Sequence, residues 1–168
     1  MQKSKTRRLV IEQLESRIAL NSYFVSPTGK DTNAGTSSAA WLTLQHASNQ
    51  LVAGDMVTVE AGTYAGFSMG WNFTENGTAS APIVWNAQSG VVINSRNPNT
   101  ADGIDLEGTS YITVKGFDVE NPSGGTITRA GIRAVSNGVT NAQGVIIENN
   151  TANNCGYWAF SPATKTGC

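Results

Sequence analysis

The sequence predicts an all-β protein in which short strands coil into a solenoid. Residues 102–121 (DGIDLEGTSYITVKGFDVEN) and 130–154 (AGIRAVSNGVTNAQGVIIENNTANN) share one pattern, in which two alternating apolar runs flank a polar break and a final Asn follows. A third unit starts at Gly156. Such a unit cannot bury its apolar face alone, so it must stack on its neighbours. Composition agrees, because 18 of 168 residues are Gly and only 14% are charged, which favours strands and tight corners over helices.

Length and charge exclude several classes of protein. The 168 residues allow one domain, and the formal net charge is −1. Residues 1–20 hold five basic and two acidic side chains, whereas residues from 21 onward hold six basic and ten acidic ones, a net charge of −4. The folded part therefore has no cationic field that would attract nucleic acid. No apolar run approaches the roughly 20 residues that cross a bilayer as a helix.

The first 21 residues differ from the rest of the chain. They are basic, yet they lack the ~7–15-residue apolar core of an ordinary signal peptide, so on their own they fit a short amphipathic helix. The run RRLVIEQLESRIALNS resembles a recurrent bacterial segment, R-R-L-x-x-E-x-L-E-x-R-x-L-L-S, that heads many large secreted or surface proteins. The resemblance implies a secreted or cell-surface protein, with residues 1–21 as a targeting segment and 22–168 as the folded domain.

Residues 22–55 predict a cap for the N-terminal end of the solenoid. Residues 22–31 favour a short strand and a turn, and residues 32–40 favour a loop. Residues 39–52 favour a helix, with Gly54 as the residue just beyond its end. Its apolar residues fall near one face: Trp41, Leu44, Ala47 and Leu51. Such a helix would plug the end and protect the exposed strand edges of the first coil.

Residues 56–168 predict the coils. Strands are expected at 56–60, 82–86 and 91–94, with a turn at 62–64 and a polar loop at 65–81. The alternating runs predict one buried core: Val57, Val59, Ile104, Leu106, Ile112, Val114, Phe117, Val119, Ile132, Val145 and Ile147. Asn149-Asn150 aligns with Gly116-Phe117 in the repeat, and Asn tolerates the left-handed conformation of such corners.

One segment carries a specific family resemblance. The stretch YFVSPTGKDTNAGTSSAAWLTLQHASNQLVAGDMVTVEAGTYAGF resembles the form YYVSPxGxDxNxGTxxxPWxTLQxAxxxxxxGDTVxVxxGTY, with departures at Ala40 and Met56. That form marks the N-terminal cap and first coil of right-handed parallel β-helix proteins of the pectate-lyase-like superfamily. The match is close over residues 22–67 and looser over 82–160. It implies a right-handed parallel β-helix with a short N-terminal capping helix, and the lack of a closing element predicts truncation at the C-terminus.

The resemblance implies a protein that binds or acts on polysaccharide and whose full-length form is of the polysaccharide-lyase type, with glycoside hydrolase as the other class of enzyme. Lyases of this class cleave uronate polymers by β-elimination, in which Ca²⁺ on carboxylates neutralises the uronate and a Lys or Arg removes a proton. The matching metal candidates are Asp102, Asp105 and Glu107, and the candidates for the catalytic base are Lys115 and Arg133. Non-catalytic adhesins share this fold, so an extracellular adhesion or structural module is the alternative.

Stacking the repeats places these charges. Strand alternation directs Asp105, Glu107 and Lys115 outward, and alignment of the two units stacks Asp105 under Arg133 and Lys115 under Glu148. Exposed pairs of this kind are usually structural and contribute at most about 1 kcal/mol. We therefore expect little or no catalysis from the 168-residue chain itself.

Exposed aromatic residues offer a second kind of contact with sugars. Trp71 and Phe73 lie in the predicted polar loop, and they are the candidates for stacking on sugar rings.

The single histidine, His46, falls on the predicted cap helix, away from the carboxylates. Cys155 and Cys168 fit no metal or redox motif, and the sequence leaves their pairing open.

Overall fold

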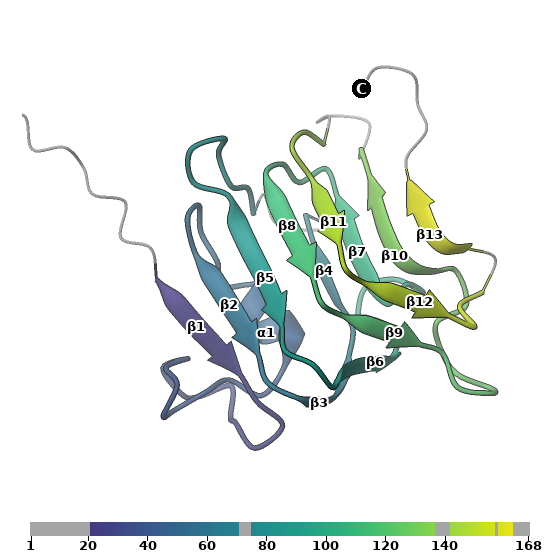
Figure 1. The fold of residues 1–168 in the computed structure, drawn as a ribbon, viewed down its shortest axis with the longest axis horizontal. Helices are drawn as coiled ribbons and strands as arrows, with labels where there is room; N and C mark the ends of the chain where they lie inside the picture. The colour runs from purple at the N-terminus through teal and green to yellow at the C-terminus, as the bar shows by residue number, and fades with distance from the viewer. Residues whose placement is uncertain (1–20, 71–74, 137–141, 157, 163–168) are drawn as a thin grey trace, which may run out of the picture.

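A computed structural model of the chain describes residues 21–70, 75–136 and 142–156, and the backbone of 158–162. The described strands stack as coils of a solenoid that runs from β1 to β13 (Figure 1). All pairs between these strands are parallel, which confirms the predicted solenoid. The only helix of the described residues is far too short to span a membrane.

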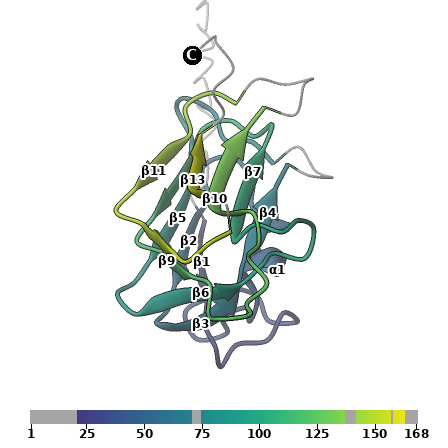
Figure 2. The same cartoon turned by 90° about the vertical axis from the view of Figure 1, so that its right-hand side faces the viewer.

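Three parallel sheets surround the core, as the end-on view shows (Figure 2). Sheet 1 contains β1 (Ser22–Val25), β2 (Met56–Val59), β5 (Ile83–Ala87), β8 (Ile112–Lys115) and β11 (Ile146–Glu148). Sheet 2 contains β4 (Phe67–Met69), β7 (Ile104–Glu107), β10 (Ala130–Val135) and β13 (Trp158–Pro162). Sheet 3 contains β3 (Gly62–Ala65), β6 (Val91–Ser95), β9 (Asp118–Glu120) and β12 (Thr151–Asn153). The helix α1 spans Leu44–Ser48.

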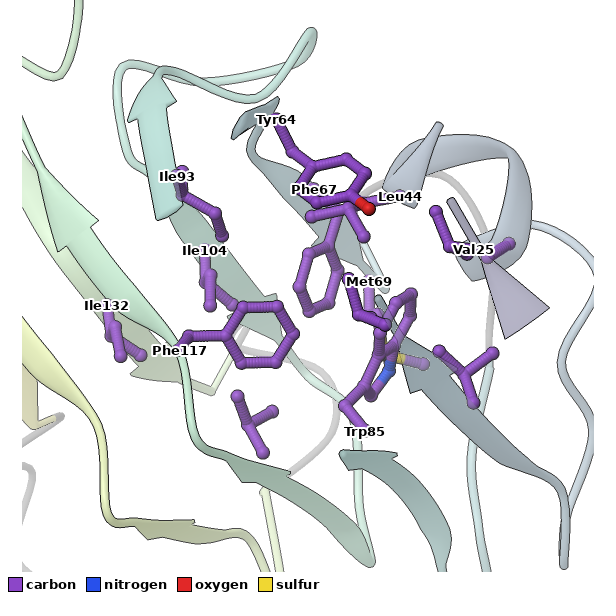
Figure 3. Close-up of a cluster of buried hydrophobic side chains, with 14 of the residues drawn as sticks. Val25, Leu44, Tyr64, Phe67, Met69, Trp85, Ile93, Ile104, Phe117 and Ile132 are labelled. Atoms are coloured by element: carbon purple, nitrogen blue, oxygen red, sulfur yellow. The ribbon is translucent and has the colours of Figure 1, made fainter. Parts of the chain in front are cut away.

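The core fills the space between the sheets with alternate residues of each strand. Phe67 stacks on Trp85 with ring centroids 4.0 Å apart, and Phe117 lies 6.0 Å from Phe67 (Figure 3). The Trp85 indole N–H points at the Met69 sulfur, 3.3 Å away, so its polar group has a partner in the core. Most of the predicted core is confirmed as buried: Val57, Val59, Ile104, Leu106, Ile112, Val114, Phe117, Val119 and Ile132.

The prediction was wrong for two core residues of the last coils. Val145 is only partly buried, and Ile147 is 37% exposed. Ile147 stacks on Val114, as the repeat alignment predicts. However, β11 is the edge strand of sheet 1, so within the described residues no further strand covers the other side of Ile147.

The cap helix is shorter than the predicted 39–52. It begins after Thr43, whose Oγ1 accepts the backbone N–H of His46 at 3.1 Å, and it ends at Ser48, with Asn49 as the C-cap, rather than at residue 52. Before Thr43 the chain is not helical, and Trp41 forms a parallel bridge with Val25. The four residues of the predicted apolar face are nevertheless all buried: Trp41, Leu44, Ala47 and Leu51.

The helix α1 covers the edge strand β4. The Gln45 side-chain amide makes the two hydrogen bonds that a neighbouring strand would make with Ser68. Its Oε1 accepts the Ser68 N–H at 2.9 Å, and its Nε2 donates to the Ser68 carbonyl at 3.0 Å. The Ser48 hydroxyl donates to the same carbonyl at 2.7 Å. These bonds satisfy polar groups that an open sheet edge would offer to another chain. The protective role expected of the cap is therefore visible at sheet 2.

The predicted turn at 62–64 was wrong, because β3 lies there, and the predicted loop at 65–81 was wrong at its start, where β3 ends and β4 follows. Glycines in this segment serve close approach rather than chain reversal. A Cβ on Gly62 would lie 2.2 Å from Pro27 Cγ, and a Cβ on Gly66 would lie 1.8 Å from the Gly103 carbonyl oxygen. The chain passes so near its neighbours that only glycine fits.

The corner between sheets 1 and 3 repeats in successive coils. Gly116 and Asn149 occupy it with φ of 82° and 55°, the left-handed region that the alignment predicts. Asn150 then joins the two coils, because its Oδ1 accepts the Phe117 N–H at 2.9 Å and its Nδ2 donates to the Val114 carbonyl at 2.9 Å. The amide thus replaces main-chain bonds that the corner interrupts.

Candidate functional site

The outer face of sheet 2 gathers most of the charged candidates. Register places Ser68, Asp105 and Arg133 side by side on β4, β7 and β10. Ile104 and Leu106 point to the opposite face, into the core. Together with side chains from the preceding loops, this face forms what we call the sheet 2 cluster: Asp102, Asp105, Glu107, Arg129 and Arg133.

Asp102 ties two coils together. It lies just before β7 and is fully buried, and it accepts Arg129 Nε at 2.9 and 3.0 Å as well as Arg129 Nη2. The Ala130 backbone N–H donates to Asp102 Oδ1 at 2.9 Å, and Thr100 Oγ1 donates to Oδ2 at 2.9 Å. Both carboxylate oxygens are therefore occupied by donors from the protein.

Arg133 bridges two carboxylates of β7. Its Nη1 donates to Asp105 Oδ1 at 2.9 Å and to Glu107 Oε2 at 2.8 Å. The predicted stacking of Asp105 under Arg133 is confirmed. Asp105 Oδ2 is buried without a hydrogen-bond partner among the described residues, and Arg129 Nη2 lies 3.8 Å from it. One acceptor of the cluster thus remains unsatisfied.

Burial perturbs the protonation of these groups. Burial raises the pKa of Asp105 to about 6; Arg133 opposes this shift, whereas the charges of Asp102 and Glu107 reinforce it. The hydrogen bond to Asp102 raises the pKa of Arg129. Burial alone would lower the pKa of Arg133, but its bonds to Glu107 and Asp105 raise it overall. Both guanidinium groups are therefore held in the charged form.

The orientation of Asp105 was predicted, but its exposure was not. Asp105 does point away from the core, yet its side chain is 0% exposed, whereas Arg129 is 42% and Arg133 is 18% exposed. The guanidinium groups of both arginines lie beside the carboxylate, with Arg133 Nη1 2.9 Å from Oδ1 and Arg129 Nη2 3.8 Å from Oδ2. A ligand on this face would therefore meet Arg129, Arg133 and Glu107, with the two aspartates beneath them.

The metal candidates are not arranged around a cation. In the described part of the chain, no group of three or more His, Cys, Asp or Glu side chains is placed to hold a metal ion. Asp102 has donors on both oxygens, and Arg133 stands between Asp105 and Glu107. Ca²⁺ takes six to eight oxygen ligands, so this donor set does not fit it. The arginines neutralise the carboxylates instead.

The other candidates lie elsewhere. Lys115 is on β8 in sheet 1, where it pairs in register with Glu148 as predicted. The structure therefore brings Arg133 together with the three carboxylates but places Lys115 on a different sheet. Trp71 and Phe73 fall outside the described residues, as do residues 1–20 and Cys168. Cys155 is a buried free thiol.

Sequence reasoning gave no role to Asn97 or Thr100 in building this site, and it offered Arg129 only as one of several basic residues, without placing it beside Asp102. Asn97 Oδ1 accepts the N–H groups of Asn99 and Thr100 at 2.9 and 2.7 Å, which fixes the loop that leads to Asp102. A signal for Arg129 was present, because aligning Gly103 with Gly131 puts Asp102 beside Ala130, one residue after Arg129. No comparable pattern marks Asn97 or Thr100.

Comparison with known proteins gives a family match over most of the chain. The family model described as "Pel9A-like, right handed beta helix region" matches residues 23–165. A curated protein of Emericella nidulans, named pectate lyase PEL9, is 38% identical over 86 residues. That alignment covers 51% of this chain and 19% of the relative, so the chain spans about a fifth of that protein's length.

Solved structures with a similar fold are more distant in sequence. The GH136 lacto-N-biosidase of Eubacterium ramulus superposes with a TM-score of 0.55 at 20% identity, over 68% of this chain and 24% of that enzyme. A rhamnogalacturonan lyase superposes with a TM-score of 0.53 at 23% identity, over 78% of this chain and 36% of that structure. At these identities the likeness shows the β-helix architecture alone.

Proposed function

Because this chain belongs to the family of Pel9A-like right-handed β-helix regions, we propose that it forms part of an extracellular protein that binds or cleaves polysaccharide. The full-length form would be of the polysaccharide-lyase type. The observation that carries this proposal is the 38% identity with a protein named pectate lyase, within a family match that spans residues 23–165. Export would be directed by residues 1–21, whose pattern fits a bacterial targeting segment.

The outer face of sheet 2 is the part of the described chain best suited to sugars. Arg129 and Arg133 present N–H donors at the surface, and Glu107, 19% exposed, presents carboxylate oxygens beside them. Sugar hydroxyl groups both donate and accept hydrogen bonds, so a surface with adjacent donors and acceptors suits them. The guanidinium groups can also bind uronate carboxylates with charge-assisted bonds.

The same geometry argues against elimination chemistry at this cluster. A general base must be able to lose its proton, and the carboxylates beside Arg129 and Arg133 raise the pKa of both arginines. Lys115, the other candidate for the base, lies on sheet 1. Ca²⁺, if the reaction requires it, would need ligands other than the sheet 2 cluster. We therefore propose that this chain supplies scaffold and sugar contacts, and that elimination takes place in other coils of the full-length protein.

Binding and turnover can be measured separately on the 168-residue chain. Electrophoresis through gels that contain polygalacturonate, alginate or rhamnogalacturonan reports binding, and the absorbance of unsaturated products, with and without Ca²⁺, reports elimination. We expect retardation by a uronate polymer without turnover. Arg133→Gln should weaken this retardation, whereas Lys115→Gln, the matched change on sheet 1, should not. Urea unfolding of each variant checks that the fold persists.

Two results would contradict this proposal in different ways. Clear Ca²⁺-dependent turnover that is lost in Lys115→Ala or Arg133→Ala, with the fold retained, would place catalysis in the chain itself. If none of the polymers retarded the chain, the proposal that the chain binds polysaccharide would be wrong.

The alternative is a non-catalytic adhesion or structural module. It is favoured by one observation, that each carboxylate of the sheet 2 cluster contacts an arginine. Such neutralised clusters can serve stability alone. The product of the complete reading frame distinguishes the two, because a lyase would release unsaturated uronides from a polymer that an adhesin only binds.

A further inference from the structure

A second concave surface lies apart from the sheet 2 cluster. A groove of about 480 Å³ opens between the N-terminal cap and the loop that follows β6. Its volume falls within the ~300–1,000 Å³ that is typical of small-molecule sites. Figure 2 shows α1 beside β4, on the side of the molecule where sheets 2 and 3 meet. The residues that line it include Pro27 and Leu42 from the cap, Thr63 and Gly66 from the first coil, and Arg96 and Pro98 from the loop.

The cap wall and the floor of the groove are held in place by close contacts. Pro27 packs directly on Gly62, where a Cβ would lie 2.2 Å from Pro27 Cγ. The Leu42 backbone N–H donates to Asp31 Oδ1 at 2.9 Å. Gly66 approaches Gly103 too closely for any side chain. The groove is thus formed before a ligand arrives, which reduces the ordering cost of binding.

The opposite wall is a loop with its own hydrogen bonds. The Arg96 backbone N–H donates to Thr126 Oγ1 at 3.0 Å, and its Nη1 donates to the Thr100 carbonyl at 3.1 Å. Asn97 Oδ1 fixes the next turn through the N–H groups of Asn99 and Thr100. The guanidinium of Arg96 is therefore positioned by a neutral carbonyl and not by a carboxylate.

Arg96 differs from the two arginines of the sheet 2 cluster. In the described residues, Arg129 and Arg133 form ion pairs with carboxylates, whereas Arg96 forms none. It is also the one charged side chain among the residues that line the groove, and it is exposed. A guanidinium offers a planar fork of donors that matches a carboxylate. The groove therefore has an uncompensated positive charge of the geometry that acids prefer.

The rest of the groove suits the ring of a sugar. Pro27, Leu42 and Pro98 give it apolar walls, and the Leu42 side chain is 39% exposed. A pyranose ring carries C–H groups on its faces and hydroxyls on its rim. The apolar walls can cover the faces, while Thr63, exposed on β3, offers a hydroxyl to the rim.

We propose that this groove binds one uronate residue of an acidic polysaccharide, with its carboxylate on Arg96 and its ring between the cap and Pro98. This inference rests on the proposed function and adds a contact point outside the sheet 2 cluster. The two sites share one loop, because Asn99 Nδ2 donates to Ser68 Oγ at 2.7 Å on sheet 2, and Asp102 ends the same loop. One acidic polymer could therefore reach both.

Titration calorimetry of the 168-residue chain with trigalacturonate tests the groove. Arg96→Gln should weaken binding about tenfold or more, because it removes a charge-assisted contact. Leu42→Ala, on the facing wall, should weaken it several-fold. Lys30→Gln is the matched control, since it removes the same charge from an exposed cap residue that does not line the groove. Lys30→Gln should leave the affinity unchanged.

Each remaining outcome counts against the groove. If trigalacturonate binds and neither Arg96→Gln nor Leu42→Ala changes its affinity, the groove is not the binding site, while the proposed function stands. Equal weakening by Arg96→Gln and Lys30→Gln would indicate general attraction by positive charge. Equal affinity for uncharged trigalactose would mean that the groove does not select the carboxylate of a uronate. If neither trigalacturonate nor any uronate polymer binds, the groove and the proposed function both fail.

Discussion

Replacing Asp102 with alanine would remove the acceptor that joins two coils at the entrance to β7 and β10. The side chain is fully buried, and alanine leaves the N–H of Ala130, a fully buried residue, and the hydroxyl of Thr100 without their partner. The third donor, Arg129, is 42% exposed and can turn to water. The cost should therefore come from the two buried donors more than from the ion pair.

The magnitude follows from those contacts. An unsatisfied buried donor costs about 1–3 kcal/mol, and a partly exposed ion pair contributes at most about 1 kcal/mol. We expect Asp102→Ala to lower the free energy of unfolding by about 3 kcal/mol. For a domain of this size, that corresponds to a decrease in Tm of roughly 6–12 °C.

Thermal and urea unfolding followed by circular dichroism measure this change. Glu120→Ala is the control, because it removes an exposed carboxylate at the end of β9 and should change stability by no more than about 0.5 kcal/mol. A Tm for Asp102→Ala within about 2 °C of the wild type would refute the reasoning. It would mean that Ala130 and Thr100 find other partners easily.

Three further predictions concern other regions. Removing residues 1–20, the bulk of the predicted targeting segment, should leave the Tm nearly unchanged, and a loss of many degrees would contradict that assignment. The pKa of Asp105 is about 6 in the folded protein, above its ordinary value, so protonated Asp105 contributes a stability that is largest below about pH 4 and is lost as the pH rises to 6. Urea unfolding over this range should show a free energy of unfolding that declines in the wild type and does not decline in Asp105→Asn. Parallel pH profiles of the two proteins would exclude this contribution of Asp105. Asn150→Ala should lower the free energy of unfolding by about 1–2 kcal/mol, because it removes two hydrogen bonds between coils. Asn149→Gly should change it by no more than about 0.5 kcal/mol, because glycine adopts a φ of 55° readily. Equal effects of the two variants in chemical denaturation would argue against the corner geometry.

The register of the coils could be read from the sequence. Two repeats of similar length and strict alternation leave little freedom, since a slip of one residue would exchange buried and exposed faces. The predicted stacking of Asp105 with Arg133 and of Lys115 with Glu148 is accordingly what the structure shows. The family match confirms the predicted resemblance to pectate-lyase-like β-helix proteins.

The first coil was harder to predict because glycine has two uses there. Gly62 and Gly66 suggest turns in the sequence, yet both belong to a segment where backbone meets a neighbouring side chain or coil. β4 has only three residues, Phe67–Met69, so its alternation is too short to recognise. Strands of this length become visible only through their neighbours in the stack.

The sequence pointed to four of the five residues of the sheet 2 cluster, all except Arg129, but not to their environment. Alternation could direct Asp105 away from the core, but it could not show that arginines from the next coil cover it. Arg129 lies just before β10 and contacts Asp102 and, at 3.8 Å, Asp105; the repeat alignment could place it near Asp102 but could not show the second contact. The raised pKa of Asp105 follows from the burial of its carboxylate, so it too required the structure.

The stacking of coils has a consequence for synthesis on the ribosome. Bonds between neighbouring coils join residues far apart in the chain, 28 for Ala130 with Asp102 and 36 for Asn150 with Val114. At about 5–20 residues per second, a strand would wait roughly 1.5–7 s for its successor. The nascent protein would therefore grow from the capped end as a zipper. Its advancing front would always expose one open strand from each sheet, so the surface at risk of aggregation would stay constant as the solenoid lengthens.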